Sequence, residues 1–308
     1  MQLSRQVVAQ GLPALGDNAG LVYDSIVRQT RDAVFHAGYS KLALGLSGGL
    51  DSALVAAIAV DALALEGIAP DQVQGIIMPS QWTSAESIED ATELAHRLGI
   101  QVKNFDIMPT YRAISDTLAP AFAECKTDVT EENIQARIRG LFLMALSNKF
   151  DWLVLATSNK SESLVGYCTL YGDMVGAFAP LAPLYKTWVY ELAHFVNDQT
   201  VNRQTKARTK LPPIPRSILE KEPSAELAQG QTDAAVLGPY NQLDALLYAA
   251  EARGWKERVL DAALNECVDD LTEQGFDRDY AVKIMGMMQR SAYKRQQACP
   301  GAELPICL

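Results

Sequence analysis

The sequence predicts an α/β protein built on a doubly wound parallel sheet, with a helical extension toward its C-terminal end. Two observations support this class. Short apolar runs alternate with amphipathic helical patterns between residues 21 and 156, and polar loops follow several of the runs. In such sheets, ligands bind outside the carboxyl ends of the strands. The polar loops at 47–52, 79–83 and 157–162 therefore become candidates for a binding site.

The elements follow one another in regular order. We expect strands at 41–46, 73–78, 101–107 and 152–156. We expect helices at 21–37, 53–64, 84–98 and 131–149. Ser84 and Thr130 are expected to cap the last two helices, while Gly38 and Gly99 end the first and third. On the helix at 131–149, we expect an apolar stripe of Ile134, Ile138, Leu141 and Ala145.

The pattern dissolves after residue 198, where a basic stretch is followed by a proline-rich one and apolar periodicity is thin. Long irregular loops in compact proteins are commonly functional lids or disordered segments. Helices resume at 239–252, 256–273 and 278–289. We divide the chain into an N-terminal segment (1–20), an α/β domain (21–198), a mobile lid (199–235), a helical part of the same domain (236–298) and a tail (299–308).

Composition excludes several classes of protein. With 27 Lys and Arg against 37 Asp and Glu, the net charge is −10, which argues against nucleic-acid binding through a general positive field. No apolar run approaches the ~20 residues that span a bilayer. The five cysteines form no C-x-x-C pair and there are three histidines, so a structural zinc site is not expected. We expect a cytoplasmic protein without membrane or nucleic-acid partners.

The strongest local signal is the glycine-rich turn G-L-S-G-G-L-D-S at 45–52, between an expected strand and an expected helix. Adjacent glycines let backbone N–H groups approach an anion closely, two serines add hydroxyl groups, and the helix N-terminus adds partial positive charge. The turn lacks the lysine of a Walker A loop and the spacing of G-x-G-x-x-G. It predicts phosphate binding.

Asp51 is not explained by phosphate binding alone, because a carboxylate beside a phosphate is costly unless a cation lies between them. A Mg²⁺ ion held by one or two carboxylates and by phosphate oxygens meets this requirement. The alternative is an acidic residue favoured at a helix N-terminus by the helix dipole.

The turn resembles the pyrophosphatase loop of N-type ATP enzymes, whose fold is Rossmann-like and of the adenine nucleotide alpha-hydrolase type. Six later segments narrow the resemblance to NAD⁺ synthetases, and together they extend it over residues 20–298. They are N-I-Q-A-R-I-R-G (133–140), A-T-S-N-K-S-E (156–162), G-Y-C-T-L-Y-G-D-M (166–174), P-L-Y-K-T (183–187), K-E-P-S-A-E-L (221–227) and Y-K-R-Q (293–296).

This resemblance implies a function and a set of site residues. The implied reaction is ATP-dependent amidation of deamido-NAD to NAD⁺ through an adenylate, releasing AMP and pyrophosphate, with Asp51, Glu162 and Lys186 as catalytic residues and Mg²⁺ on Asp51 and Glu162. ATP contacts are implied at Gly45, Leu46, Ser47, Gly48, Gly49, Leu50, Asp51, Ser52, Thr157, Lys186 and Ser224. Deamido-NAD contacts are implied at Asn133, Arg137, Arg139, Glu162, Tyr167, Cys168, Thr169, Leu170, Asp173 and Lys294.

Two segments depart from the ammonia-dependent branch of the family, which has T-D-H-A-A-E at 157–162 and G-D-G-G-A-D at 172–177. The L-Y-G-D-M version at 170–174 instead resembles the synthetase half of glutamine-dependent enzymes, which carry an amidase domain upstream. About twenty residues precede the first expected helix, so we expect no such domain here. We expect the chain to use ammonia, as a homodimer, with a separate glutaminase subunit as an alternative source.

Rival functions remain at this stage. Other pyrophosphatase-loop enzymes form GMP or asparagine, or thiolate tRNA, although the last usually show paired cysteines and a basic surface. A nucleotide-binding regulatory module without turnover is a rival of another class. Such a module would be expected to lose its metal carboxylates first, and Asp51 and Glu162 are both present.

Overall fold

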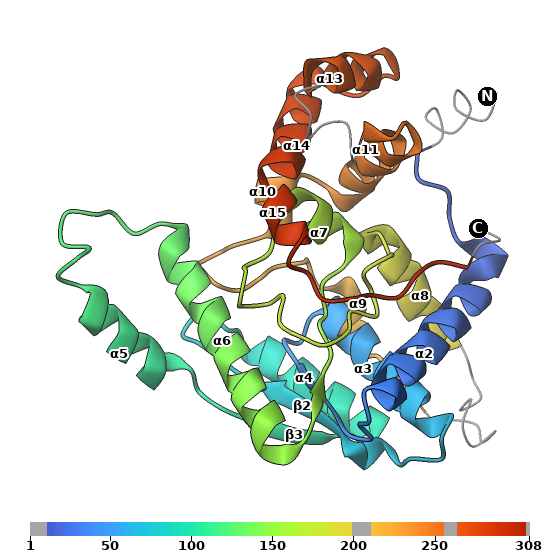
Figure 1. Cartoon of the computed structure of the whole chain (residues 1–308), viewed down its shortest axis with the longest axis vertical. Coiled ribbons are helices and arrows are strands. Elements are labelled where there is room, and N and C mark those ends of the chain that lie inside the picture. Colours follow the sequence, from blue (N-terminus) through green and yellow to red (C-terminus); the bar gives the residue numbers. More distant parts are fainter. Residues whose placement is uncertain (1–10, 199–210, 256–263, 306–308) are drawn as a thin grey trace.

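The computed structural model of the chain describes residues 11–198, 211–255 and 264–305 (Figure 1). Its centre is a sheet of four parallel strands in the spatial order β3-β2-β1-β4. The strands are β1 (Leu42–Gly45), β2 (Val73–Ile77), β3 (Gln101–Asn104) and β4 (Leu153–Val154). In the centre, Leu42 pairs with Val73 on one side and with Leu153 on the other. The predicted parallel α/β sheet is confirmed, with strands ending one to three residues before the apolar runs do.

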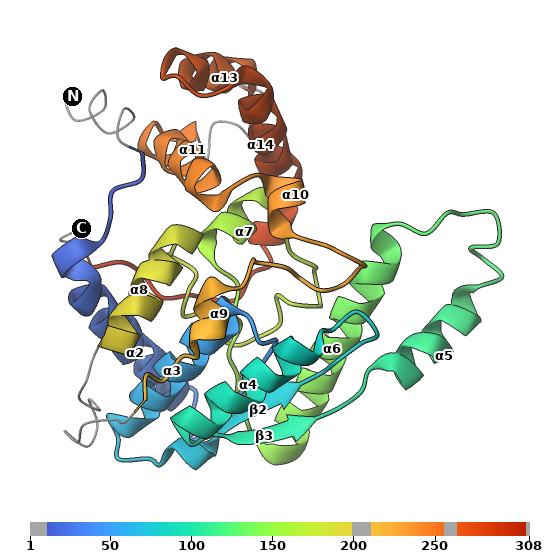
Figure 2. The same ribbon diagram turned by 180° about the vertical axis from the view of Figure 1, so that it is seen from behind.

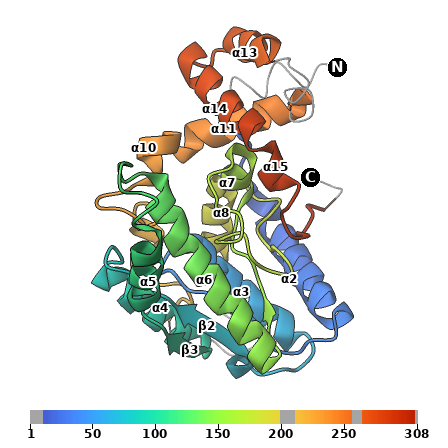
Figure 3. The same cartoon turned by 60° about the vertical axis from the view of Figure 1, so that its left-hand side comes forward.

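Helices cover both faces of the sheet, because side chains alternate along each strand and give it two apolar faces. Leu42 and Leu44 pack into a large core together with α2, α3, α4 and α8, whereas Ala43 packs into a second core with α5 and α6. Figure 3 shows α5 and α6 toward one side of the molecule and α2 toward the other. The predicted double winding is confirmed. These helices are α2 (Ala19–His36), α3 (Leu50–Ala64), α4 (Ala85–Leu98), α5 (Met108–Leu118), α6 (Val129–Phe150) and α8 (Lys186–Asp198).

Helix ends follow the local signals in α4 but not in α6. Ser84 caps α4 by accepting a hydrogen bond from the backbone N–H of Ser87, and Gly99 ends the helix in the left-handed conformation, as predicted. The cap of α6 is Asp128 rather than Thr130, because Asp128 and Glu131 form a reciprocal capping box there.

The apolar stripe expected on α6 is wrong in its second half. Ile134 and Ile138 are buried, but Leu141 is 60% exposed and Ala145 is also exposed, while Leu143 takes up the contact with the sheet. The α6 helix has 22 residues and is about 33 Å long at 1.5 Å per residue, whereas the strands of the sheet have only two to five residues. The helix is therefore longer than the strands that it packs against.

A group of helices stands at one end of the molecule, above α7 (Lys160–Val165) in Figures 1 and 2. Its members are α11 (Tyr240–Ala252), α13 (Leu264–Glu273), α14 (Arg278–Arg290) and α15 (Ala292–Arg295). This is the predicted C-terminal extension. It shares the large apolar core, through fully buried Leu246, Leu271 and Ile284 among others.

The predicted lid is only partly described, since residues 199–210 lie outside the described residues. Residues 211–235 include α9 (Arg216–Glu220) and the start of α10 (Asp233–Leu237). Ile214 and Ile218 are fully buried in the large core, so the impression of thin apolar content is wrong for this part. These two isoleucines, four residues apart, anchor the segment around α9 to the core. The mobility of the lid stays a prediction.

Two short 3-10 helices, at Gly16–Asn18 and Pro70–Gln72, complete the described elements. None of the helices in the described part of the chain has the length and apolar content needed to cross a bilayer.

Candidate functional site

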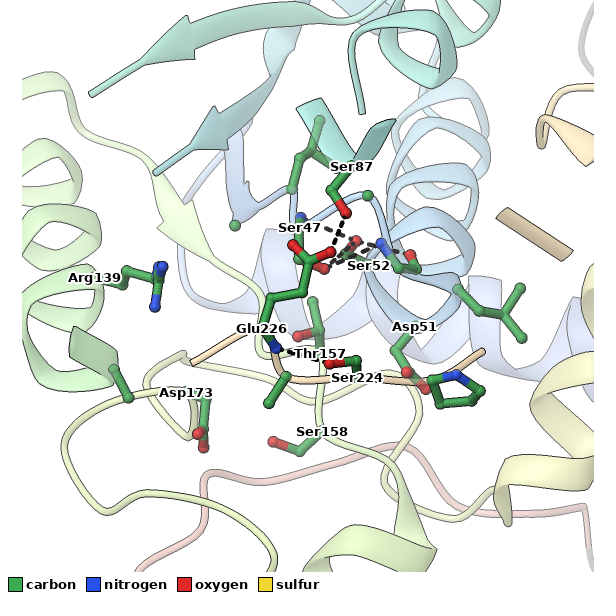
Figure 4. A pocket seen from close by; sticks show the side chains of 18 of the residues that line it. Ser47, Asp51, Ser52, Ser87, Arg139, Thr157, Ser158, Asp173, Ser224 and Glu226 are labelled. Carbon is green, nitrogen blue, oxygen red and sulfur yellow. Dashed lines mark hydrogen bonds between the residues drawn. The ribbon is translucent and has the colours of Figure 1, made fainter. Parts of the chain in front are cut away.

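A pocket opens where β1, β2 and β4 end, at the carboxyl edge of the sheet. All eight residues of the turn at 45–52 line it. Inside the turn the hydroxyl groups of Ser47 and Ser52 are 3.2 Å apart, Ser52 Oγ donates to the carbonyl of Gly49 at 3.0 Å, and Gly49 N donates to Ser47 Oγ at 3.2 Å (Figure 4). The turn leads directly into α3, and Leu50, Asp51 and Ser52 of its first turn line the pocket. The first N–H groups of a helix have no partner within it, so this end of the pocket is suited to an anion such as phosphate.

The close approach of the turn to α4 explains Gly48. This residue has φ +76°, and a Cβ atom here would lie 2.2 Å from the carbonyl oxygen of Ser87. Only glycine combines that backbone conformation with so little space. Ser87, on the first turn of α4, also lines the pocket.

Three residues predicted to be catalytic meet at one end of the pocket. The ammonium group of Lys186 contacts Asp51 Oδ2 and lies 3.4 Å from Glu162 Oε1. Lys186 is the first residue of α8 and is only 3% exposed. Its charge is therefore removed from bulk water and balanced by the two carboxylates. Residues from the first turns of three helices, up to 135 positions apart, therefore form one cluster.

Asn159 connects two members of this cluster and was missed by sequence reasoning. Its side-chain N–H₂ donates to Asp51 Oδ1 at 3.0 Å, and its carbonyl oxygen accepts from the backbone N–H of Glu162 at 3.0 Å, which makes it the N-cap of α7. It is fully buried. A capping signal was available, because an Asn three residues before a Glu is a typical helix start.

Asp233 and Tyr240 extend the cluster and were also missed. The Tyr240 hydroxyl donates to Asp233 Oδ2 at 2.8 Å and lies 3.3 Å from Glu162 Oε1, while Lys186 Nζ lies 5.3 Å from the centre of the Tyr240 ring. Asp233 is 5% exposed and lines the pocket. No sequence pattern relates these residues to Glu162, some 70 positions earlier.

The electrostatics of the cluster follow from burying three carboxylates around one amine. Burial, together with the charges of Asp51 and Asp233, raises the pKa of Glu162 to about 8, although Lys186 opposes this. Burial by itself would lower the pKa of Lys186, but the attraction of Asp51 and Glu162 outweighs it, so the pKa lies above its ordinary value. The pKa of Asp233 is likewise raised by burial. The cluster therefore holds Lys186 charged and favours an additional cation.

The donor set fits a Mg²⁺ ion that is shared with phosphates. Asp51 and Glu162 both reach one point, the position of the Lys186 ammonium group, and Mg²⁺ commonly binds one or two carboxylates and completes its shell with phosphate oxygens and water. Within the described ranges, no group of three or more His, Cys, Asp and Glu side chains could hold a metal by itself. The residues thus suit a metal that enters with a polyphosphate.

The segment that follows α9 closes another side of the pocket. Ser224 of this segment lines the pocket, and its hydroxyl donates to the carbonyl of Gln231 at 2.6 Å. Thr157, the other residue outside the turn and α8 for which an ATP contact was predicted, lines the pocket too. Glu226, which was not predicted, accepts from the hydroxyl groups of Ser84 and Ser87 at 2.9 and 2.7 Å, at the N-terminus of α4. Figure 4 shows its side chain pointing away from Ser224 and toward Ser87.

The predicted dinucleotide residues divide into two groups. Arg139, Glu162, Tyr167, Cys168 and Asp173 line the pocket. Of the other five, Thr169 and Leu170 belong to the loop at 166–173, and the remaining three support that loop from outside the pocket lining. Asn133 accepts from Thr169 Oγ1 at 2.6 Å, Arg137 donates to the carbonyl of Leu170 at 3.3 Å, and Lys294 Nζ donates to the carbonyl of Cys168 at 2.6 Å.

Arg139 stands out among the polar residues of α6. It donates to the carbonyl of Met78 at 2.9 Å, and burial lowers the pKa of its guanidinium to about 10. In Figure 4 it points into the pocket across from Ser47 and above Asp173. A half-buried cation without a carboxylate ion pair among the described residues is suited to an anionic ligand.

The four cysteines that the structure describes carry no sign of an activated nucleophile. Burial and the nearby Asp173 raise the pKa of Cys168 to about 12, which is opposite to the lowered pKa of a reactive thiol. Cys125 is exposed and free, Cys267 is buried, and Cys307 lies outside the described residues. The pKa of Cys299 is also raised by burial.

Known proteins share this fold and sequence over most of the chain. The NAD synthase family model matches residues 22–298. The glutamine-dependent NAD(+) synthetase of Acinetobacter baylyi is 44% identical over 292 residues, which cover 95% of this chain and 49% of the relative. The chain thus spans about half the length of the curated relatives it matches.

Solved structures of similar length are also close. The NH3-dependent NAD synthetase of Campylobacter jejuni is 26% identical with a TM-score of 0.66, covering 94% of this chain and 99% of that one. The NMN synthetase of Francisella tularensis is 27% identical with a TM-score of 0.66, covering 90% and 95%.

Proposed function

The chain belongs to the NAD synthase family, and we propose that it catalyses the ATP-dependent amidation of deamido-NAD to NAD⁺ with ammonia as the nitrogen donor. One observation carries the proposal. A phosphate-binding turn, the Asp51–Lys186–Glu162 cluster and the loop at 166–173 line the same pocket. A nucleoside triphosphate and a second anionic substrate would meet there.

The first step is adenylation. An oxygen of the nicotinate carboxylate attacks the α-phosphorus of ATP, a new O–P bond forms, and the bond to pyrophosphate breaks. The turn at 45–52 holds the departing phosphates through N–H and hydroxyl groups, and Lys186 neutralises the negative charge that develops on them. Bound at Asp51 and Glu162, Mg²⁺ would supply further charge neutralisation.

The second step forms the amide. Ammonia attacks the acyl carbon of the adenylate, the C–N bond forms, and the C–O bond to AMP breaks. A carboxylate is a poor acyl donor, and adenylation provides the leaving group that it lacks. The protein mainly positions the two substrates and shields their charges.

The nitrogen source divides the relatives, since some are named glutamine-dependent and one NH3-dependent. Glutamine hydrolysis needs an activated nucleophile with a base and an oxyanion pocket. The raised pKa of Cys168 speaks against a thiolate in this pocket. We expect the 308-residue chain to use free ammonia and to be inactive with glutamine alone. A glutaminase partner that delivers ammonia is the alternative.

A homodimer is part of the proposal. Val129, Leu141 and Met144 of α6 are 58%, 60% and 40% exposed, on the helix that also supports the loop at 166–173. A second copy covering this helix would bury them. Analytical ultracentrifugation at several protein concentrations tests this, and a monomer at all of them contradicts it. The absence of nucleic-acid partners stays a prediction, motivated by the net charge of −10, and a cytoplasmic location stays a prediction as well.

The decisive assay supplies the purified chain with ATP, Mg²⁺ and ammonium, and offers deamido-NAD, nicotinate mononucleotide, xanthosine monophosphate or aspartate in turn. Mass spectrometry identifies AMP and the amidated product. We expect AMP and NAD⁺ in equal amounts with deamido-NAD. Preference for the mononucleotide would make the chain an NMN-forming enzyme, and turnover of xanthosine monophosphate or aspartate would support the amidotransferase rivals. AMP formation with none of them would favour a regulatory role.

A further inference from the structure

Helix α11 places two carboxylates against the segments that carry Glu162 and Lys186. Asp244 and Glu251 are seven residues apart and therefore lie on one face of the helix. Resting on the function proposed above, we infer that Asp244, supported by Glu251, is a positioning residue that fixes Glu162 and Lys186 in the arrangement needed for adenylation. Neither carboxylate was singled out from the sequence.

Asp244 binds the two immediate neighbours of those residues. It is fully buried, and its Oδ1 accepts the hydroxyl hydrogen of Ser161, the residue before Glu162. Its Oδ2 accepts from the backbone N–H of Thr187, the residue after Lys186, at 2.8 Å. One side chain thus joins the first turn of α7 to the first turn of α8.

The hydrogen bonds around Asp244 require both of its carboxylate oxygens to act as acceptors. Ser161 Oγ accepts from the backbone N–H of Lys186 at 2.9 Å, so its own hydrogen is available for Asp244. Asp244 therefore faces two donors, and both of its oxygens must accept. A carboxylate provides two acceptor atoms, whereas an asparagine provides one and turns an N–H₂ group toward a donor.

Glu251 binds the same two segments through Tyr185, the residue before Lys186, and through Lys160, the residue before Ser161. Its Oε2 accepts from the hydroxyl group of Tyr185 and forms an ion pair with Lys160 Nζ. Lys160 N also donates to the carbonyl of Leu184 at 2.8 Å. Glu162 and Lys186 are therefore flanked by anchored residues, and their spacing depends on a helix about 60 residues beyond Lys186.

Such support matters because the cluster works only at short range. Lys186 Nζ lies 3.4 Å from Glu162, so a small movement of either segment would change the charge that faces the phosphates. A misplacement of about 1 Å can cost about 10²-fold in rate. Loss of Asp244 should therefore act on the rate of adenylation more than on ATP binding, which the turn at 45–52 provides.

The test compares Asp244→Asn with Asp270→Asn. Asp270 is also a carboxylate with two donors, Arg253 and Trp255, but both lie within the C-terminal extension and not at α7 or α8. Both variants are measured by thermal unfolding and by deamido-NAD-dependent exchange of labelled pyrophosphate into ATP, without ammonia. We expect Asp244→Asn to lower kcat for exchange by more than tenfold while KM for ATP changes less than threefold. Asp270→Asn should lose stability but keep its exchange rate.

The outcomes are distinct. An exchange rate within twofold of the unmodified chain for folded Asp244→Asn overturns the inference, and so does an equal loss in Asp270→Asn. Should Asp244→Asn not fold, Ser161→Ala removes the hydroxyl group that links Asp244 to Lys186 and keeps the bond from Thr187 to Asp244, and unchanged exchange in that variant overturns the inference as well. Absence of exchange in the unmodified chain would instead contradict the proposed function.

Discussion

The two ends of the pocket are built in different ways. The phosphate turn consists of consecutive residues, 45–52, whose polar groups bond one another between β1 and α3. The cluster around Lys186 draws on Asp51, Glu162, Asp233 and Tyr240, which span 189 positions of the chain. The turn therefore forms from local interactions, whereas the cluster forms only when distant segments pack together.

The two ends also differ in charge. The turn offers N–H and hydroxyl groups with no charge of its own apart from Asp51, which suits an anion. The cluster surrounds one buried amine with three carboxylates, which suits an extra cation. Asp51 belongs to the turn by sequence and to the cluster by contact, so it connects the two halves.

Replacing that connection should have the largest effect. We expect Asp51→Asn to abolish detectable AMP formation, a loss of about 10³-fold, because it removes a charge that faces both Lys186 and the metal. Asp51 lies at the pocket rather than in an apolar core, so the fold should persist, as judged by circular dichroism. Asp71→Asn, at an exposed carboxylate, is the control. Near-normal turnover of Asp51→Asn in Mg²⁺ would show that the metal assignment is wrong.

Glu162→Gln attacks the assembled half alone. We expect a loss of about 10²-fold in kcat, since the amide keeps the shape of the side chain but cannot ionise to the carboxylate that would face Lys186 and hold the proposed Mg²⁺. Steady-state kinetics separate two roles. A loss confined to kcat supports metal binding, whereas a raised KM for deamido-NAD with unchanged kcat would make Glu162 a substrate contact.

Gly48→Ala attacks the local half. The new Cβ would collide with the backbone of Ser87 at a φ of +76°, so we expect a cost of about 2–3 kcal/mol in unfolding free energy and roughly tenfold in turnover. Gly67→Ala is the matched control, because Gly67 has φ +71° but nothing within 4 Å of a Cβ atom. Equal destabilisation of both variants in urea would mean that backbone conformation alone, and not contact with α4, explains Gly48.

The smallest effect is expected for the predicted lid. Residues 199–235 contribute Lys221, Ser224 and Asp233 to the pocket and contain a run of Lys and Arg between 203 and 210. Polyanionic ligands should offset the entropy lost when this segment becomes ordered. We expect saturating ATP and deamido-NAD to slow tryptic cleavage here several-fold. Cleavage at an unchanged rate counts against a lid.

Sequence patterns were sufficient where the physics is local. The strand–turn–helix at 42–64 follows from an apolar run, two glycines and an alanine-rich stretch, each acting on its neighbours. The cap at Ser84 and the stop at Gly99 depend on one turn of helix. The errors began where a partner was needed. Leu141 is apolar and helical, yet it is exposed, while Leu143 of the same helix is buried against the sheet.

The tertiary structure decided which charges meet. Lys186 was identified through resemblance to a family motif, but its contact with Asp51 depends on the packing of α8 against the core of the sheet. Asp233 and Asp244 could not be identified as site residues from the sequence, because an acidic residue in a helical pattern is expected to be solvent-exposed unless its burial is known. A buried carboxylate is defined by donors on other segments, and those donors are brought near it only by folding. The sequence by itself therefore determined the fold class and the strand–turn–helix at 42–64, whereas the cluster around Lys186 and its supports were decided by tertiary packing.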